Sequence, residues 1–147
     1  MIVSTRGRYA LRVLVDMAEH SQPESSKGEE GVVQNPRIPL KEIAERQEIS
    51  QKYVESIMTL LSKNNLVDAA HGKGGGYKLN RPAKDYKIGD ILRITEGTLA
   101  PVACLEKDAE ECKRKPVCRT LKLWSKLDEL IEGYLDSVTL ADLMTKE

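Results

Sequence analysis

The residues of this sequence that most clearly offer chemistry are its three cysteines. Cys104, Cys112 and Cys118 are the only cysteines in the chain, with seven residues between the first two and five between the last two. The segment that carries them is crowded with charged residues, so burial in an apolar core does not explain their presence. The basic residues around Cys112 and Cys118 favour the thiolate, which is the form that reacts and binds metals.

The spacing of the thiols favours an iron–sulfur cluster. Structural zinc usually has four ligands in closely spaced pairs, whereas cluster ligands come from longer loops and include residues other than cysteine. A structural disulfide is disfavoured in a cytosolic protein, and an odd count leaves one thiol over. A thiol redox switch, a zinc site or no site at all stay open as alternatives. We also expect Cys118 in the first turn of a long helix, whose dipole stabilises a thiolate.

The stretch from Pro39 to Pro82 predicts a winged helix-turn-helix. On a first short helix, Leu40 and Ile43 form an apolar face, and small Ala44 lets a second helix cross close by. Ser50 is a strong N-cap for that second helix because its hydroxyl can bond a free backbone N–H. The apolar residues of the second helix recur at helical spacing: Val54, Ile57, Met58 and Leu61.

Two short strands around a glycine-rich tip predict a wing after the second helix, which Asn64-Asn65 can end in a left-handed conformation. The tip reads His71-Gly-Lys-Gly-Gly-Gly-Tyr77. Glycines let a backbone approach DNA closely, and Lys73 and Lys78 add positive charge. We therefore expect DNA binding. An ordinary helical hairpin followed by a β-turn is the alternative interpretation.

Helical patterns continue on both sides of the predicted winged helix-turn-helix. An amphipathic helix with a capped start is expected within residues 1–20, and a flexible insertion over 21–37. A short apolar helix that contains Ile88, Ile91, Leu92 and Ile94 is expected to end at Gly97. A long helix is expected over about 117–136, and a short last helix over 140–145. Apolar residues three and four positions apart on the long helix are typical of a helix that meets a partner helix, which predicts a homodimer. These residues are Val117, Leu121, Trp124, Leu127, Ile131, Tyr134 and Val138.

The expected fold is therefore mainly α with a small β-wing. Residues 1–82 are predicted to form the DNA-binding domain, and 83–147 the cysteine loop and dimerisation helix. The 23 basic and 23 acidic residues balance, but the surplus of basic residues precedes residue 120, which fits a sequence-specific DNA binder. The sequence has no signal peptide or long apolar run, so we expect a cytoplasmic protein without a membrane partner. No catalytic triad, phosphate loop or redox C-x-x-C motif is visible, which indicates that the protein is not an enzyme.

Along nearly its whole length apart from 21–37, the chain resembles the IscR, NsrR, RirA and CymR group of bacterial winged-helix repressors. The segments that carry the resemblance, besides the three cysteines, are Ser4-Thr-Arg-Gly-Arg-Tyr-Ala-Leu11, Leu40-Lys-Glu-Ile-Ala-Glu-Arg-Gln47, Ile49-Ser-x-x-Tyr-Val-Glu55, Gly72-Lys-Gly-Gly-Gly-Tyr-Lys-Leu79 and Ser137-Val-Thr-Leu-Ala-Asp-Leu143. The resemblance implies a homodimeric regulator, expected to be a repressor, that binds a double-stranded DNA operator. It also implies that DNA affinity responds to a 2Fe–2S or 4Fe–4S cluster, of which we favour the first. A cluster of this kind is expected to be lost from protein prepared in air.

Functional residues can be assigned by this resemblance. The resemblance implies that the recognition helix contacts bases and that Glu55 can accept a hydrogen bond from a cytosine amino group. The predicted DNA-binding residues are Arg8, Tyr9, Ser50, Gln51, Lys52, Tyr53, Glu55, His71, Lys73 and Gly74. The predicted cluster ligands are Cys104, Cys112 and Cys118. His71 stands where many members have an arginine that enters the minor groove, and a neutral imidazole does not replace a guanidinium.

The chain departs from the group at the fourth cluster ligand. Leu121 stands where IscR-like members have a histidine, and Arg8 where NsrR-like members have an aspartate; the cysteine spacing is closer to that of RirA-like members. Candidate fourth ligands are a carboxylate of the loop, a small molecule or a residue of the other subunit, and the loop carboxylates are Glu106, Asp108, Glu110 and Glu111. The alternative function, suggested by CymR-like members, is a cluster-free regulator of cysteine or sulfur metabolism that acts through thiol oxidation or a metabolic-enzyme partner.

Overall fold

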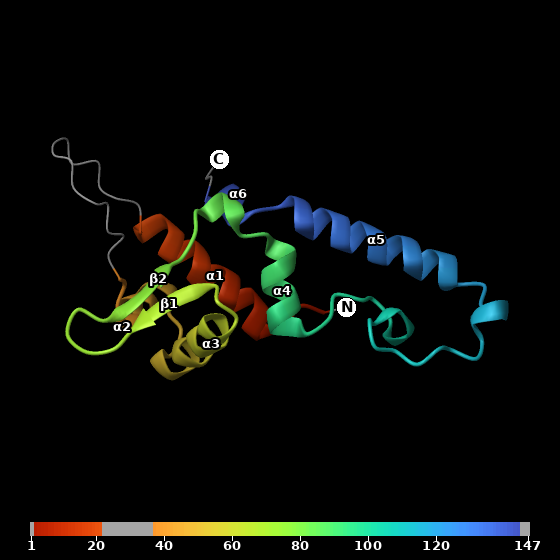
Figure 1. Ribbon diagram of the computed structural model, residues 1–147, viewed down its shortest axis with the longest axis horizontal. Coiled ribbons are helices and arrows are strands. Elements are labelled where there is room, and N and C mark those ends of the chain that lie inside the picture. The colour runs from red at the N-terminus through yellow and green to blue at the C-terminus, as the bar shows by residue number, and fades with distance from the viewer. Residues whose placement is uncertain (1, 22–36, 145–147) are drawn as a thin grey trace.

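The computed structural model of the protein describes residues 2–21 and 37–144. It shows a helical head with a small wing at one end and a long helix, α5, that extends away from the head (Figure 1). The α-helices are α1 (Thr5–His20), α2 (Leu40–Gln47), α3 (Gln51–Lys63), α4 (Ile88–Glu96), α5 (Leu121–Ser137) and α6 (Leu140–Met144). The strands are β1 (Val67–Ala70) and β2 (Gly76–Leu79), and the 3-10 turns are η1 (Ala83–Asp85), η2 (Ala103–Leu105) and η3 (Lys115–Val117).

Helix α1 runs through the centre of the head. It begins where the Ser4 hydroxyl accepts a hydrogen bond from the Gly7 N–H at 3.0 Å, as its N-cap position predicts. Ala10, Val13, Leu14 and Met17 are fully buried, so one face of α1 is the core of the head. A Cβ at Gly7 would collide with the Glu96 carboxylate, so a larger residue where α1 passes the end of α4 would require the Glu96 side chain to move.

The helix-turn-helix forms as predicted. Helix α2 ends because Glu48 adopts a left-handed backbone, with φ 54°, and the turn buries Ile49 between the helices. The Ser50 hydroxyl then accepts from the Tyr53 N–H at 3.2 Å and begins α3. The predicted apolar face of α3 has no solvent exposure at any of its four positions, which are Val54, Ile57, Met58 and Leu61.

The wing is an antiparallel β1–β2 pair that runs from Val67 opposite Leu79 to Ala70 opposite Gly76. Of the two asparagines before it, Asn65 takes the left-handed conformation, with φ 57°. Ile38 exchanges two backbone hydrogen bonds with Tyr77, at 2.8 and 2.9 Å, a pairing that the sequence did not predict. This pairing fastens the chain just before α2 to the wing.

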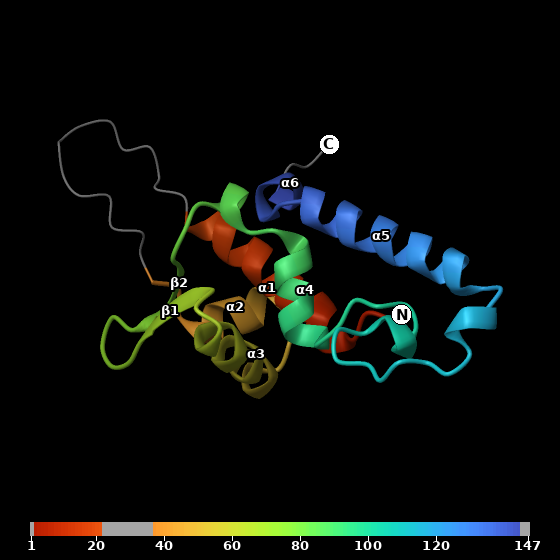
Figure 2. The same cartoon turned by 45° about the vertical axis from the view of Figure 1, so that its right-hand side comes forward.

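Beyond the wing, the chain passes through α4, runs out through the cysteine segment and returns along α5 to α6 (Figure 2). Helix α4 ends at Gly97, with φ 80°, and the Thr139–Asp142 capping box forms at the start of α6. The predicted start of α5 at Val117 is wrong. Residues 115–117 form the 3-10 turn that contains Pro116, and Cys118 has an extended backbone, with ψ 111°, so the helix begins only at Leu121.

Two other predictions fall on residues that the structure does not describe. Residues 22–36, most of the predicted insertion, and Thr145, the predicted last residue of α6, lie outside the described residues. Within 2–21 and 37–144, no helix combines the length and the apolar character that crossing a membrane requires.

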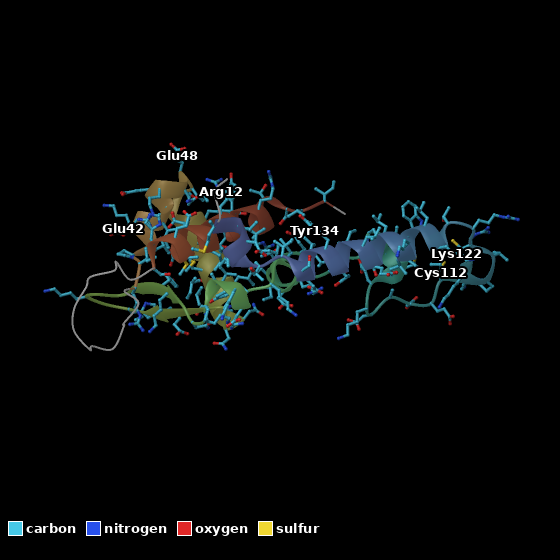
Figure 3. The ribbon with its side chains drawn as sticks, turned by 90° about the horizontal axis from the view of Figure 1, so that it is seen from above. Arg12, Glu42, Glu48, Cys112, Lys122 and Tyr134 are labelled. Atoms are coloured by element: carbon cyan, nitrogen blue, oxygen red, sulfur yellow. The ribbon has the colours of Figure 1, made fainter. Side chains whose placement is uncertain are left out.

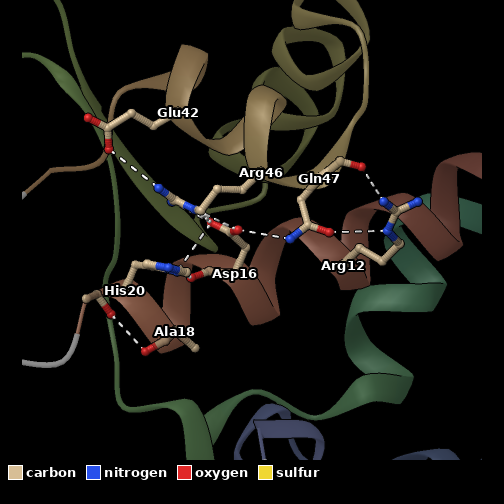
Figure 4. Close-up of polar contacts among 8 residues, drawn as sticks. Arg12, Asp16, Ala18, His20, Glu42, Arg46 and Gln47 are labelled. Atoms are coloured by element: carbon tan, nitrogen blue, oxygen red, sulfur yellow. Dashed lines mark hydrogen bonds and ion pairs between the residues drawn. The ribbon is translucent and has the colours of Figure 1, made fainter.

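A network of charged and polar side chains joins α1 to α2 (Figure 4). Asp16 on α1 is only 2% exposed and accepts two hydrogen bonds from the Arg46 Nε and Nη2 groups, at 3.0 and 2.7 Å. Gln47 donates to the same carboxylate at 2.9 Å, and Arg12 donates to the Gln47 side chain at 3.2 Å. The hydrogen bond with Asp16 raises the pKa of Arg46 above its ordinary value. This network sets the position of α2, and hence of the turn before α3.

Replacement of the buried acid tests the network. Asp16→Ala should lower the free energy of unfolding by about 2–4 kcal/mol, because it leaves the Arg46 guanidinium half-buried without its carboxylate. Urea denaturation measures the change. Glu45→Ala is the control, since its ion pair with Lys41 has side chains 67% and 73% exposed and should contribute less than about 0.5 kcal/mol. Equal losses in the two variants would contradict the assignment.

Candidate DNA-reading surface and cysteine pocket

The start of α3 presents the predicted recognition residues to solvent. Because the core side of this helix is completely buried, the residues between the core positions must point outwards. Ser50, Gln51, Lys52 and Glu55 are exposed, and Tyr53 is half-buried. The first turn of α3 therefore offers amide, ammonium and carboxylate groups, which are the kinds of group that read base edges.

The wing lies beside this helix and adds three of the predicted residues. His71, Lys73 and Gly74 are exposed at its tip, where Gly72 and Gly74 need positive φ values of 89° and 78°. A groove of about 410 Å³ between the wing and the starts of α2 and α3 is lined by residues that include Lys41, Gln51, Glu55 and His71. Lys41 was not predicted from the sequence, because only the Ile38–Tyr77 pairing brings the start of α2 to the wing.

The two predicted residues on α1 differ in environment. Arg8 is exposed, and its guanidinium donates to the Thr5 hydroxyl at 3.1 Å. Tyr9 is half-buried and packs edge-on against Tyr53, with ring centroids 5.7 Å apart and planes at 86°. The Arg12 guanidinium lies 5.0 Å from the Tyr9 ring centroid and also donates to the Gln47 carbonyl. Tyr9 thus supports the recognition helix, a packing role that the sequence did not reveal.

The three cysteines line one pocket. Its volume is about 270 Å³, and its other lining residues include Leu105, Glu110, Glu111, Lys115 and Leu121. Hydrogen-bonded turns fold the segment around it: the Ala109 N–H donates to the Glu106 carbonyl at 3.1 Å and the Lys115 N–H to the Cys112 carbonyl at 3.0 Å. In the described segments, no three His, Cys, Asp or Glu side chains converge closely enough to hold a single metal ion. The pocket brings together three thiols, which are donors of the type that holds iron–sulfur clusters.

Cys118 does not lie in the first turn of α5, contrary to the sequence-based expectation, because the helix begins three residues later. The surroundings of its thiol nevertheless lower the pKa of Cys118. The Thr120 hydroxyl, 3.5 Å from the sulfur, lowers the pKa of Cys118 by hydrogen bonding, with further contributions from the Thr120 and Leu121 backbone and the Arg114 charge. The thiolate is thus favoured by the residues that lead into α5.

Helix α5 leaves an apolar stripe uncovered in this chain. Leu123, Leu127, Leu130 and Tyr134 are between 38% and 68% exposed and recur at intervals of four, three and four residues. Ile131, Leu135 and Val138 pack against the chain's own core instead. The free face is therefore rotated from the predicted one, which had included Ile131 and Val138. Seen from above, Tyr134 lies between the head and the end of the molecule where Cys112 and Lys122 lie (Figure 3).

An ion-pair cluster fastens α5 to α4. The Arg93 guanidinium donates to Asp136 at 2.9 Å and to Glu132, and to Asp90 at 3.1 Å on its own helix. The hydrogen bonds to Asp136 and Glu132 raise the pKa of Arg93, and the same contact lowers the pKa of Asp136. A Cβ at Gly89 would collide with the Asp136 carboxylate, so a larger residue at this position would require the Asp136 side chain to move.

A helix-turn-helix whose second helix is capped, exposed at its start and flanked by a glycine-tipped wing defines a winged helix-turn-helix DNA-binding regulator. A family model described as Rrf2, iron-dependent transcriptional regulator, matches residues 3–146. The chain therefore belongs to the Rrf2 family of transcriptional regulators. This agrees with the resemblance found in the sequence.

Individual relatives support the same class. The transcriptional regulator IscR of Serratia proteamaculans is 36% identical over 147 residues, covering 100% of this chain and 81% of the relative. IscR of Vibrio parahaemolyticus is 35% identical over 145 residues, covering 99% and 78%. Among solved structures, CymR, the global cysteine regulator of B. subtilis, matches with a TM-score of 0.72 at 30% identity, covering 98% and 96%. T. potens IscR matches with a TM-score of 0.69 at 33% identity, covering 98% and 86%. The chain is a DNA-binding transcriptional regulator and not an enzyme.

The environment of Cys118 makes a prediction for metal-free protein. Thr120→Val removes the hydroxyl that lowers the thiol pKa, so the pH–rate profile for alkylation of Cys118 should move to higher pH. Below the midpoint of that profile the variant should therefore react more slowly than the parent protein. Mass spectrometry of iodoacetamide-treated protein measures each cysteine separately. Thr120→Ser, which keeps a hydroxyl, is the matched control, and a shift of equal size in both variants would refute the assignment.

Proposed function

We propose that the protein is a homodimeric repressor whose affinity for its operator is set by an iron–sulfur cluster held by Cys104, Cys112 and Cys118. The observation that carries the proposal is the single pocket lined by all three thiols, next to the residues that lead into α5. In this proposal residues 1–82 read DNA, and residues 83–147 sense and dimerise. We favour a 2Fe–2S over a 4Fe–4S cluster. When bound, such a cluster supplies a redox-active and oxidant-sensitive centre.

The DNA-reading roles follow from the chemistry of the exposed groups. The exposed Glu55 carboxylate would accept a hydrogen bond from a cytosine amino group in the major groove. Gln51 and Lys52 offer further donors there, and the Ser50 and Arg8 groups suit phosphates. At the wing, Lys73 adds charge and Gly74 lets the backbone approach the DNA. His71 supplies a weaker minor-groove contact than arginine would, and Tyr9 and Tyr53 hold the helix in place.

Sequence preference should depend on the recognition helix, and overall affinity for DNA on the wing. Lys73→Ala should weaken binding to all duplexes by a similar factor and reduce the slope of log affinity against log salt by about 1. Glu55→Ala should instead relax the sequence preference, by about 1–3 kcal/mol at the base pair it reads. Fluorescence anisotropy with operator and scrambled duplexes at several salt concentrations measures both effects. If the two variants lose the same discrimination, the division of roles is wrong.

We infer that a second copy of this chain covers the stripe of Leu123, Leu127, Leu130 and Tyr134. Water-exposed leucines at heptad-like spacing on one side of a 17-residue helix are stabilised by burial against the same stripe of a partner. Two heads joined in this way can contact two half-sites about one turn of DNA apart. The separation of the heads then depends on how each α5 sits on its own head.

Two features of the chain could link the cysteine pocket to that separation. Only Arg119 and Thr120 lie between Cys118 and α5, so a change in the backbone at Cys118 moves the start of the helix. Arg93, Glu132 and Asp136 fix the other half of α5 to α4, which packs on α1. A displacement at the start of α5 therefore reaches the head as a change in the pose of α4. Ligand binding that favours one pose shifts the population towards it.

Loss of the Arg93 contacts should uncouple the cysteine pocket from DNA binding. In Arg93→Gln, the ratio of operator affinities between cluster-loaded and cluster-free protein should fall towards one, because the ion pairs that hold α5 against α4 are lost. Lys126→Gln is the matched control, since it breaks an exposed pair with Glu129 on the same helix and should keep the parent ratio. Anaerobic anisotropy titrations give both ratios. A parent-like ratio in Arg93→Gln would exclude this route of coupling.

The cysteines provide the test of the proposed function itself. Protein purified without oxygen should contain iron and sulfide and show visible absorption, and Cys104→Ala/Cys112→Ala/Cys118→Ala should contain neither. The two proteins should differ in operator affinity by about 5-fold or more, the usual size of coupling between two sites. An iron-free parent protein, or equal affinities, would overturn the cluster-sensing proposal.

A cluster-free thiol sensor of cysteine or sulfur status is the second candidate function. The lowered pKa of Cys118 and the similarity to the B. subtilis global cysteine regulator favour it. A solved S. aureus CymR in oxidised form also matches, at 28% identity and a TM-score of 0.69. This candidate predicts a colourless dimer whose operator affinity changes on thiol oxidation or on addition of a metabolic-enzyme partner.

A further inference from the structure

The cluster site proposed above lacks a fourth ligand from a cysteine. Three thiolates leave one position of a four-ligand cluster site to be filled, and clusters accept a residue other than cysteine there. Leu121 lines the pocket but has no donor atom, and the Arg8 guanidinium is a cation that donates to Thr5. Neither residue can coordinate iron. The fourth donor must come from elsewhere.

The acidic residues of the loop do not lie equally close to the thiols. Of Glu106, Asp108, Glu110 and Glu111, only Glu110 and Glu111 line the pocket that the three cysteines share. The difference follows from the backbone. The turn from Glu106 to Ala109 lies between the first cysteine and the stretch 109–112, whose four residues all line the pocket. Glu106 and Asp108 belong to that turn and do not line the pocket.

We propose that a carboxylate of the Glu110–Glu111 pair is the fourth ligand of the cluster, a site that rests on the function proposed above. Both side chains are exposed, so each carboxylate can turn towards the pocket without breaking a buried contact. Lys115 at the pocket places a positive charge near the ligands and offsets part of their negative charge.

An oxygen donor among three sulfurs has a consequence for sensing. Thiolates are soft ligands that hold cluster iron firmly, whereas a carboxylate is a hard donor and exchanges more readily. If Glu110 or Glu111 held one iron of a bound cluster, that carboxylate would be the ligand that chelators displace most readily. The exposure of Glu110 and Glu111 to solvent has the same effect.

The test compares two double variants of the full-length protein with the same charge change in the same loop. Glu110→Gln/Glu111→Gln removes the carboxylates that line the pocket, and Glu106→Gln/Asp108→Asn removes those that do not. After anaerobic reconstitution, the first variant should lose iron to a chelator about 10-fold faster or more. It should also show changed Mössbauer quadrupole splitting at one iron. The second variant should match the parent protein in both measurements.

Parent-like chelator kinetics and spectra in Glu110→Gln/Glu111→Gln would overturn the proposal and leave the partner subunit or a small molecule as the ligand source. An iron-free parent protein would instead overturn the proposed function, so the two failures are distinguishable.

Discussion

The packing of α5 against α4 is the constraint on which the rest of the molecule depends. The head has its own core, built on α1 and α3, while the cysteine pocket lies at the other end of α5. Arg93 binds Glu132 and Asp136 across the helix pair, and Ile131 and Leu135 pack against the core. These contacts make α5 an extension of the head. In the proposed function, they connect events at the cysteines to the recognition helix.

This arrangement explains why groups with different chemistry occur in different places. The head is fixed by its buried core and by the buried Asp16 carboxylate that binds Arg46, and a reading surface of this kind keeps its shape. The cysteine segment, in contrast, has exposed charged residues and two short 3-10 turns, so few buried contacts oppose a change there. In the proposed function the deformable segment senses and the rigid head binds, with α5 between them.

Much of the fold could be predicted from local signals. Ser4 and Ser50 cap helices and Gly97 ends one, because each acts through a bond or dihedral angle within its own turn. The face of α5 left free could not be predicted, since Leu123 and Leu130 follow the same spacing as Trp124 and Ile131. Only the tertiary packing of Ile131 decides which face is covered. Similarly, the sequence offered four acidic residues near the thiols, and only the folded loop separates Glu110 and Glu111 from the others.

The most direct test of the account follows the pocket and the DNA in one anaerobic sample. Visible circular dichroism reports cluster content, and anisotropy of a labelled operator reports binding, while a chelator is added stepwise. Because the state of the three thiols is proposed to set the pose of the reading heads, the dichroism and the operator anisotropy should change in constant proportion. A dichroism signal that disappears while operator binding stays constant would contradict it.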